Sequence, residues 1–175
     1  LIYLVSRYNE IVYSQQLEVT QWHITDSIIR IYFNNTAYMA QQLDYGVAVV
    51  AYINHPQTSR LEWHPFTVST SDSNNKSYIS IKGSGKRTRT FIQNILATNS
   101  ISTQLITLGH IVPSCFRFYK FYSNKIIFCS GIGITPFLSI ITKQPPNSQI
   151  LLVWSVNNMN MIHEFSDTLR SLSGT

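Results

Sequence analysis

Residues 125–137 read KIIFCSGIGITPF, and this stretch decides the fold of the C-terminal third of the chain. Its apolar first half has the character of a buried strand, its two glycines form a turn, and Pro136 suits the first turn of a following helix. A second apolar run covers residues 150–154, and apolar residues recur at helical spacing over residues 161–172. The order strand, glycine turn, helix, strand, helix predicts a βαβα unit of a doubly wound parallel sheet.

The first two thirds of the chain have the pattern of short strands. Alternating or continuous apolar runs are separated by clusters rich in Asn, Ser and Pro, which favour turns. Apolar residues between residues 91 and 96 have helical spacing and predict one short helix. The spacing of the strands predicts an antiparallel barrel or sandwich. The expected strands cover residues 17–24, 27–33, 47–53, 66–70 and 78–82.

Length and composition limit the classes of protein to which the chain can belong. A chain of 175 residues suits one large domain or two small ones. Hydrophobic residues make up 44% and aromatic residues 13%, which excludes wholesale disorder. The sequence has neither a glycine period nor charged heptads, which excludes collagen and coiled coil. The longest uncharged apolar run, between Lys125 and Lys143, is short and broken by Gly and Pro, so no membrane-spanning helix is expected.

Charge is distributed unevenly along the chain. Thirteen basic residues stand against eight acidic ones, and no acidic residue lies between Asp72 and Glu164. A long segment of one sign indicates either an anionic partner, such as a phosphate-bearing cofactor, or a solvated basic face. Nine basic residues lie in it: Lys76, Lys82, Lys86, Arg87, Arg89, Arg117, Lys120, Lys125 and Lys143.

Three stretches are candidates for chemistry. Residues 61–69 form a strand that starts near Pro65, and its hydroxyls and amides either serve the fold or hold a flat heterocycle. Residues 81–88 place two glycines and three cations before a helix, which makes either a flexible basic turn or an anion site. Residues 130–137 place a glycine-rich turn between strand and helix, where backbone can approach a ligand closely.

The sequence does not contain the residue patterns of several other kinds of functional site. The five histidines show no pair at helical spacing for a metal, and no G-x-S-x-G motif is present. Carboxylates are too scarce to suggest a glycosidase pair. Cys115 and Cys129 form no C-x-x-C motif, and two reduced cysteines are expected. We therefore expect no metal site.

The ordered set of motifs resembles the dehydrogenase region of the ferric reductase and NADPH oxidase family over about residues 10–170. The motifs are, in order, Leu61-Glu62-Trp63 followed by His64-Pro65-Phe66-Thr67, then Gly85-x-x-Thr88, then residues 131–137, then Leu152-Val153-Trp154.

The resemblance implies a fold of the ferredoxin-reductase kind. An antiparallel Greek-key flavin-binding barrel is expected at residues 10–118, and the N-terminal part of a doubly wound NAD(P)H-binding domain, cut short, at residues 119–175. It also implies an oxidoreductase that passes electrons from NADPH or NADH through FAD to haem, and on to ferric iron or oxygen. The haems would lie in a membrane domain of the same polypeptide, absent from this sequence, with this region on its cytoplasmic side. No nucleic-acid partner is expected.

The resemblance also assigns roles to individual residues. Residues 64–67 would line the flavin ring, Lys82 would face the FAD pyrophosphate, and the later glycines would bind the nicotinamide nucleotide. Hydride transfer between two cofactors needs no protein acid or base, so no catalytic residue is assigned. The cofactor-binding set is His64, Pro65, Phe66, Thr67, Lys82, Gly85, Thr88, Gly131, Gly133, Thr135 and Pro136.

The sequence departs from the family pattern at two places. Residues 112–115 read VPSC where the family has a Gly-Pro-Tyr/Phe-Gly turn, and Asn157-Asn158 stands where NADPH-preferring members often have an arginine. Three alternatives stay open, and these departures support the second of them. They are a soluble ferredoxin-reductase-like flavoenzyme, a divergent member that binds no nucleotide, and a basic barrel that binds single-stranded nucleic acid.

Overall fold

The computed structural model describes most of the two regions that the sequence separates. It covers residues 14–25, 27–37, 39–40, 49–55, 62–70, 76–98, 107–113, 121–142 and 147–173.

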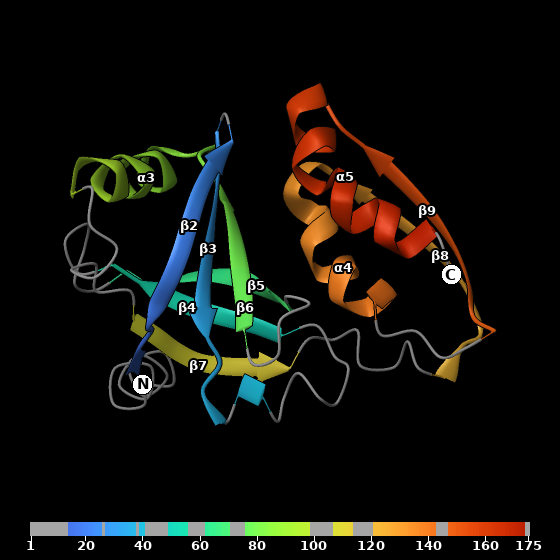
Figure 1. Cartoon of the computed structure of the whole chain (residues 1–175), viewed down its shortest axis with the longest axis horizontal. Coiled ribbons are helices and arrows are strands. Elements are labelled where there is room, and N and C mark those ends of the chain that lie inside the picture. The colour runs from blue at the N-terminus through green and yellow to red at the C-terminus, as the bar shows by residue number, and fades with distance from the viewer. Residues whose placement is uncertain are drawn as a thin grey trace, which may run out of the picture.

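Seven strands form one antiparallel sheet in the N-terminal part of the chain (Figure 1). Their order across the sheet is β1-β7-β4-β5-β6-β3-β2. Strand β3 pairs with β6 rather than with β4, which is the crossover that defines a Greek key. The strands are β1 (Gln15–Gln16), β2 (Val19–Thr25), β3 (Ile28–Asn34), β4 (Val49–Asn54), β5 (His64–Thr70), β6 (Lys76–Lys82) and β7 (Thr107–Pro113).

The two edges of this sheet are consecutive in the chain. Only Leu17 and Glu18 separate edge strand β1 from edge strand β2, so the sheet must curl to bring its edges together. The observed pairings link each strand to its neighbours in the order above and do not include a β1–β2 ladder. The predicted antiparallel flavin-type sheet is therefore confirmed, and full closure into a barrel stays a prediction.

The sheet encloses an apolar core that a helix completes at one end. Inward-facing residues such as Ile31, Phe33 and Ile79 are fully buried. Helix α3 (Lys86–Thr98) places Phe91 and Ile95 against the same core. This is the short helix expected near residues 91–96, and it begins directly after the basic glycine-bearing turn.

The C-terminal part contains two parallel strands and two helices. Strand β8 (Asn124–Ser130) pairs in parallel with β9 (Gln149–Ser155), as a βαβ unit requires. Between them, the 3₁₀ helix η3 (Gly131–Ile134) leads directly into α4 (Thr135–Thr142), and α5 (Met159–Ser173) follows β9. The predicted order of elements is confirmed.

The burial of this small sheet differs from the prediction. Helices α4 and α5 both lie between the parallel pair and the seven-stranded sheet (Figure 1). They cover one face, where Ile127 is buried, whereas Ile126, Phe128 and Leu151 on the other face are 64%, 71% and 58% exposed. Continuous apolar runs predict strands that are covered on both faces. Among the residues that the structure describes, only one face of this pair is covered.

Several further expectations depend on residues 114–120, which lie outside the described part of the chain. The boundary between residues 118 and 119 therefore stays a prediction, and so does the state of Cys115. Cys129 is a free cysteine, and burial raises the pKa of its thiol, so it stays protonated at neutral pH. Within the described ranges, no helix has the length and apolar character needed to cross a membrane.

Candidate flavin and nucleotide site

Strand β5 presents two faces to two different neighbours. His64 and Phe66 lie on one face, with ring centroids 6.5 Å apart, and both line a small cavity beside α3. Thr67 shares the opposite face with Ser69, because side chains alternate along a strand. That face is turned toward α4, whose Ser139 hydroxyl donates to the carbonyl of Val68 at 3.5 Å. The predicted set 64–67 is thus divided between the two faces.

The start of α3 has an unusual charge. Helix N-termini favour anions, because unpaired backbone N–H groups and the helix dipole make them positive. The first turn of α3 contains no acidic residue and instead carries Lys86, Arg87 and Arg89. These cations are unfavourable there unless an anion compensates them. This end of α3 therefore has the chemistry of a phosphate site.

Side chains at this turn fix its shape. The Thr88 hydroxyl accepts a hydrogen bond from the Gly85 N–H at 3.1 Å and donates to the Gly85 carbonyl at 3.2 Å. The guanidinium of Arg87 pairs with the carboxylate of Glu62. Thr88 therefore holds the helix start and Glu62 orients Arg87, while contact of Thr88 with a pyrophosphate stays a prediction.

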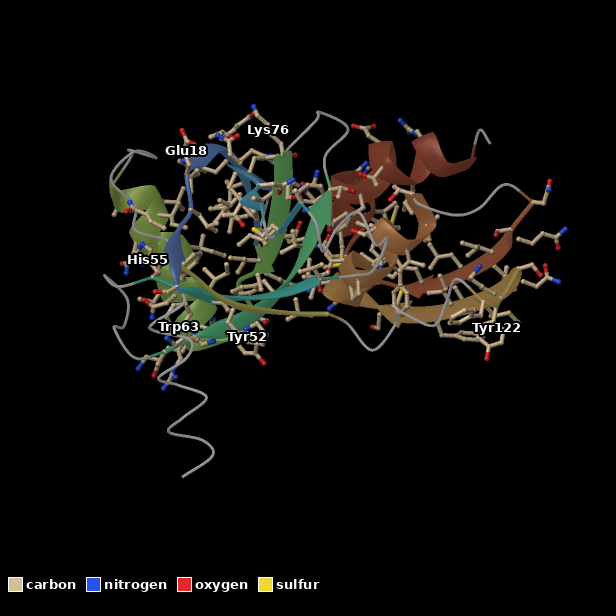
Figure 2. All side chains as sticks on the ribbon, turned by 90° about the horizontal axis from the view of Figure 1, so that it is seen from below. Glu18, Tyr52, His55, Trp63, Lys76 and Tyr122 are labelled. Atoms are coloured by element: carbon tan, nitrogen blue, oxygen red, sulfur yellow. The ribbon has the colours of Figure 1, made fainter. Side chains whose placement is uncertain are left out.

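The groove between β5 and α3 is shallow. A cavity of ≈ 10 Å³ lies between His64, Phe66, Arg87, Thr88 and their apolar neighbours. This volume suits about one water molecule. A ligand larger than a water molecule would have to lie across the surface above this cavity. The groove adjoins the end of the molecule where Figure 2 shows His55 and Trp63.

His55 lines this groove with an uncharged ring. Its ring meets Phe91 of α3 edge-on, at a centroid distance of 5.0 Å. Burial lowers the pKa of His55, so it is uncharged at neutral pH. Its ring therefore adds no positive charge to the groove.

The glycine turn after β8 is held by a tryptophan from β9. Gly131 has a φ of 52°, in the left-handed region that favours glycine. The Trp154 indole donates a hydrogen bond to the Gly131 carbonyl at 2.9 Å. Gly133 is exposed, and a Cβ placed on it would meet no atom within 4 Å. The turn thus leaves open space above Gly133 at the carboxyl end of β8, where ligands bind in doubly wound sheets.

Thr135 and Pro136 support this turn. The Thr135 hydroxyl donates to the Ile132 carbonyl at 3.1 Å, and the residue is only 7% exposed. Pro136 stands in the first turn of α4, as predicted. Thr135 therefore shapes the turn through its own hydrogen bond, and contact of its side chain with a nucleotide stays a prediction.

The asparagine pair lies at the carboxyl end of β9. The Asn158 side-chain oxygen accepts a hydrogen bond from the Asn160 N–H at 2.9 Å, so it caps α5. Asn157 is exposed beside it. The other departure from the family pattern lies elsewhere, because Val112 and Pro113 end strand β7 and pair with Val50 and Val49 of β4.

The structure gathers most of the predicted residues into two groups, whereas Pro65 and Thr67 lie on the opposite face of β5 from His64 and Phe66. His64, Phe66 and Thr88 line the α3 groove, Gly85 is hydrogen-bonded to Thr88, and Lys82 ends β6 one short turn before them. Gly131, Gly133, Thr135 and Pro136 form the turn between β8 and α4. The Glu62–Arg87 ion pair was missed, although both residues lie within the quoted stretches. Among the described residues, no three His, Cys, Asp or Glu side chains gather into a metal site.

Solved structures with this arrangement define its class. A ferredoxin NADP⁺ reductase from Neisseria gonorrhoeae with bound FAD and NADP superposes with a TM-score of 0.63 at 16% identity, covering 91% of this chain and 64% of that one. A flavohemoglobin from Malassezia yamatoensis with bound FAD and heme gives 0.64 at 16% identity, covering 97% and 45%. At these identities the likeness concerns the fold, which is ferredoxin-reductase-like.

Sequence comparison identifies the family. A family model described as an FAD-binding domain matches residues 13–150, which is most of the chain. The chain therefore belongs to the FAD-binding domain family of the ferric reduction oxidases and NADPH oxidases, as a distant member. The expected family is confirmed.

Curated relatives are much longer than this chain. Ferric reduction oxidase 2 of Arabidopsis thaliana is 31% identical over 111 residues, which are 62% of this chain and 15% of that protein. NADPH oxidase 3 of Rattus norvegicus is 24% identical over 140 residues, which are 69% of this chain and 24% of that protein. The chain thus spans a small part of these relatives.

Proposed function

We propose that this chain is the flavin-dehydrogenase part of a membrane reductase that takes electrons from NADPH or NADH. FAD would bind across the groove between β5 and α3, and the nicotinamide nucleotide would bind at the glycine turn after β8. The electrons would then pass to haem in a membrane domain of the same polypeptide, on the cytoplasmic side of which this region would lie. Ferric iron or oxygen would be the final acceptor.

The start of α3 is the observation that carries this proposal. Three cations, Lys86, Arg87 and Arg89, occupy its first turn, and the one carboxylate that pairs with any of them in the described part of the chain is Glu62, on Arg87. Two negative phosphates would relieve this repulsion and satisfy backbone N–H groups at the same time. Lys82 is close enough in the chain to add a further cation from the end of β6.

The residues of this chain would bind and orient the cofactors rather than react. When bound, FAD supplies the chemistry, because it accepts two electrons from nicotinamide and releases them one at a time. His64 and Phe66 would contact the flavin in the groove, whereas the Thr67 side chain lies on the opposite face of β5, turned toward α4. The Gly131–Trp154 hydrogen bond holds the turn that would present the nicotinamide.

The test uses the full-length protein with FAD and haem under anaerobic conditions. Addition of NADPH should bleach the flavin absorbance first and reduce the haem afterwards. Flavin that binds but stays oxidised with either nucleotide would contradict the dehydrogenase function. Flavin reduction without haem reduction would favour a soluble ferredoxin-reductase-like activity instead.

Two glycines of the turn should respond differently to alanine. Gly131→Ala forces a left-handed conformation on a residue with a side chain and should lower the free energy of unfolding by about 1–2 kcal/mol. Gly133→Ala places its methyl group in open space, so stability should be unchanged while nucleotide binding weakens. Chemical denaturation and nucleotide titration measure the two effects. Equal stability of both variants, or unchanged nucleotide affinity for Gly133→Ala, would contradict this assignment.

The Asn157-Asn158 pair should make coenzyme choice weak. Neither amide pairs with a 2′-phosphate as arginine does, and Asn158 already caps α5. We expect the ratio of kcat/KM for NADPH over NADH to stay below about a hundredfold, or roughly 2.7 kcal/mol. Asn157→Arg should raise this ratio about tenfold, with Asn157→Gln as the matched control. A stronger preference in the wild-type protein would mean that another cation holds the phosphate.

A further inference from the structure

Two basic side chains from neighbouring strands meet one carboxylate of α5. His23 of β2 and Arg30 of β3 are direct partners in the sheet register, so their side chains lie on the same outer face. His23 Nε2 is 3.2 Å and Arg30 Nη2 is 3.0 Å from Glu164 Oε1. Arg30 Nη2 also donates to the Glu164 carbonyl at 3.0 Å. The Arg30–Glu164 pair thus joins the antiparallel sheet to the last helix.

Arg30 is held between aromatic rings of both parts of the molecule. Its guanidinium carbon is 4.8 Å from the ring centre of Tyr78 on β6 and 5.2 Å from that of Phe165 on α5. Arg30 Nη1 also donates to the Tyr32 hydroxyl at 3.4 Å. Burial raises the pKa of Tyr78, so that ring stays neutral. Lysine cannot reproduce a planar group that stacks on two rings and donates two hydrogen bonds at once.

The rest of this interface combines a buried apolar cluster with a polar cavity. Ile28 enters the apolar cluster of α4 and α5, and Ser139 of α4 donates to the Val68 carbonyl at the long distance of 3.5 Å. A cavity of ≈ 230 Å³ adjoins Arg30, which is one of its lining residues, and most of the others carry hydroxyl groups, such as Ser69 and Thr142. A polar cavity does not fix the orientation of helices α4 and α5 against the antiparallel sheet, whereas the buried and stacked Arg30–Glu164 ion pair does.

Contacts lead directly from Arg30 to the glycine turn. Phe165, on which Arg30 stacks, meets Trp154 edge-on with centroids 6.0 Å apart. Trp154 in turn donates to the Gly131 carbonyl. Phe165 belongs to the same buried cluster as Ile134 at the end of the turn. A contact that holds Phe165 against β3 therefore also fixes the position of the glycine turn at Gly131.

We propose that Arg30, paired with Glu164, is a positioning residue that sets the nucleotide turn in place against the flavin-binding sheet. This role rests on the proposed function, because it concerns the distance between the two cofactors. The pair contacts neither the α3 groove nor the turn itself. Its loss should therefore slow transfer between the cofactors while each of them still binds.

The test is Arg30→Lys in the full-length protein. This substitution keeps the positive charge and removes the stacking on Tyr78 and Phe165 and the hydrogen bond to the Tyr32 hydroxyl. We expect the rate constant of flavin reduction at saturating NADPH to fall at least fivefold. The Kd values for FAD and for the nucleotide should change less than twofold. Arg170→Lys is the matched control, since Arg170 lies on the same helix in an exposed ion pair with Asp167, and its rate should be that of the wild type.

Two results would overturn the role of Arg30. One is a wild-type rate of flavin reduction in Arg30→Lys, and the other is a slower rate explained entirely by lost FAD or nucleotide. If Arg30→Lys does not fold, Glu164→Gln decides the question in the same assay, with the same expected result. If NADPH does not reduce the flavin of the wild-type protein, that result contradicts the proposed function instead.

Discussion

The 175-residue chain, purified alone, is expected to bind FAD weakly and to oxidise NADPH or NADH hardly at all. Fusing to its C-terminus the segment that follows the matched region in ferric reduction oxidase 2 should raise nucleotide oxidation by at least tenfold. The measurement is the steady-state rate of NADH and NADPH oxidation with a dye acceptor, for both lengths of chain at equal FAD occupancy.

The physical reason lies in the small parallel sheet. A doubly wound nucleotide-binding domain has about five or six strands, and its ligand lies at the carboxyl ends of several of them. The described part of this chain has two such strands, with Phe128 71% exposed on a face that nothing described here covers. Figure 2 shows Tyr122 exposed near the same pair. Equal rates for the short and the long chain would show that the nucleotide site is complete without further strands.

Lys82→Glu should weaken FAD binding at least tenfold. Lys82 ends β6, one short turn before the start of α3, and the substitution would set a carboxylate beside two phosphates. A charged hydrogen bond contributes roughly 1.5–3 kcal/mol, so losing it and adding repulsion exceeds a factor of ten. Fluorescence titration of FAD measures the change.

Lys76→Glu provides the matched control for this prediction. Lys76 starts the same strand, so it carries the same charge at the opposite end of β6 (Figure 2). Its replacement changes the net charge of the chain equally, and FAD affinity should alter less than twofold in moderate salt, which screens distant charges. Equal losses in the two variants would indicate a general charge effect and would remove Lys82 from the pyrophosphate site.

Local sequence patterns were sufficient for most of the elements that form the site. The strand with His64, the basic helix start at Lys86 and the turn with Gly131 each depend on neighbouring residues, whose spacing and turn chemistry are visible in the chain. Strand β7 was not predicted. Its partner β4 lies far away in the sequence, and its apolar residues are interrupted by Gly109.

Features that depend on tertiary contacts were not predictable in this way. Arg30 and Glu164 are 134 positions apart, and nothing near either residue indicates the other. The division of His64 and Thr67 between two faces follows from strand alternation, yet which face meets α3 depends on how the sheet curls. The hydroxyl of Thr135 likewise has a partner only once the 3₁₀ turn has formed.

The central claim is that the β5–α3 groove binds FAD through its phosphates, and direct titration of the purified chain tests it. The chain should bind FAD saturably, one molecule per chain, and should bind riboflavin, which has the same ring and no phosphates, far more weakly. Lys82→Glu should remove most of this difference. A chain that binds FAD and riboflavin equally, or that shows no saturable binding of FAD, would contradict the account.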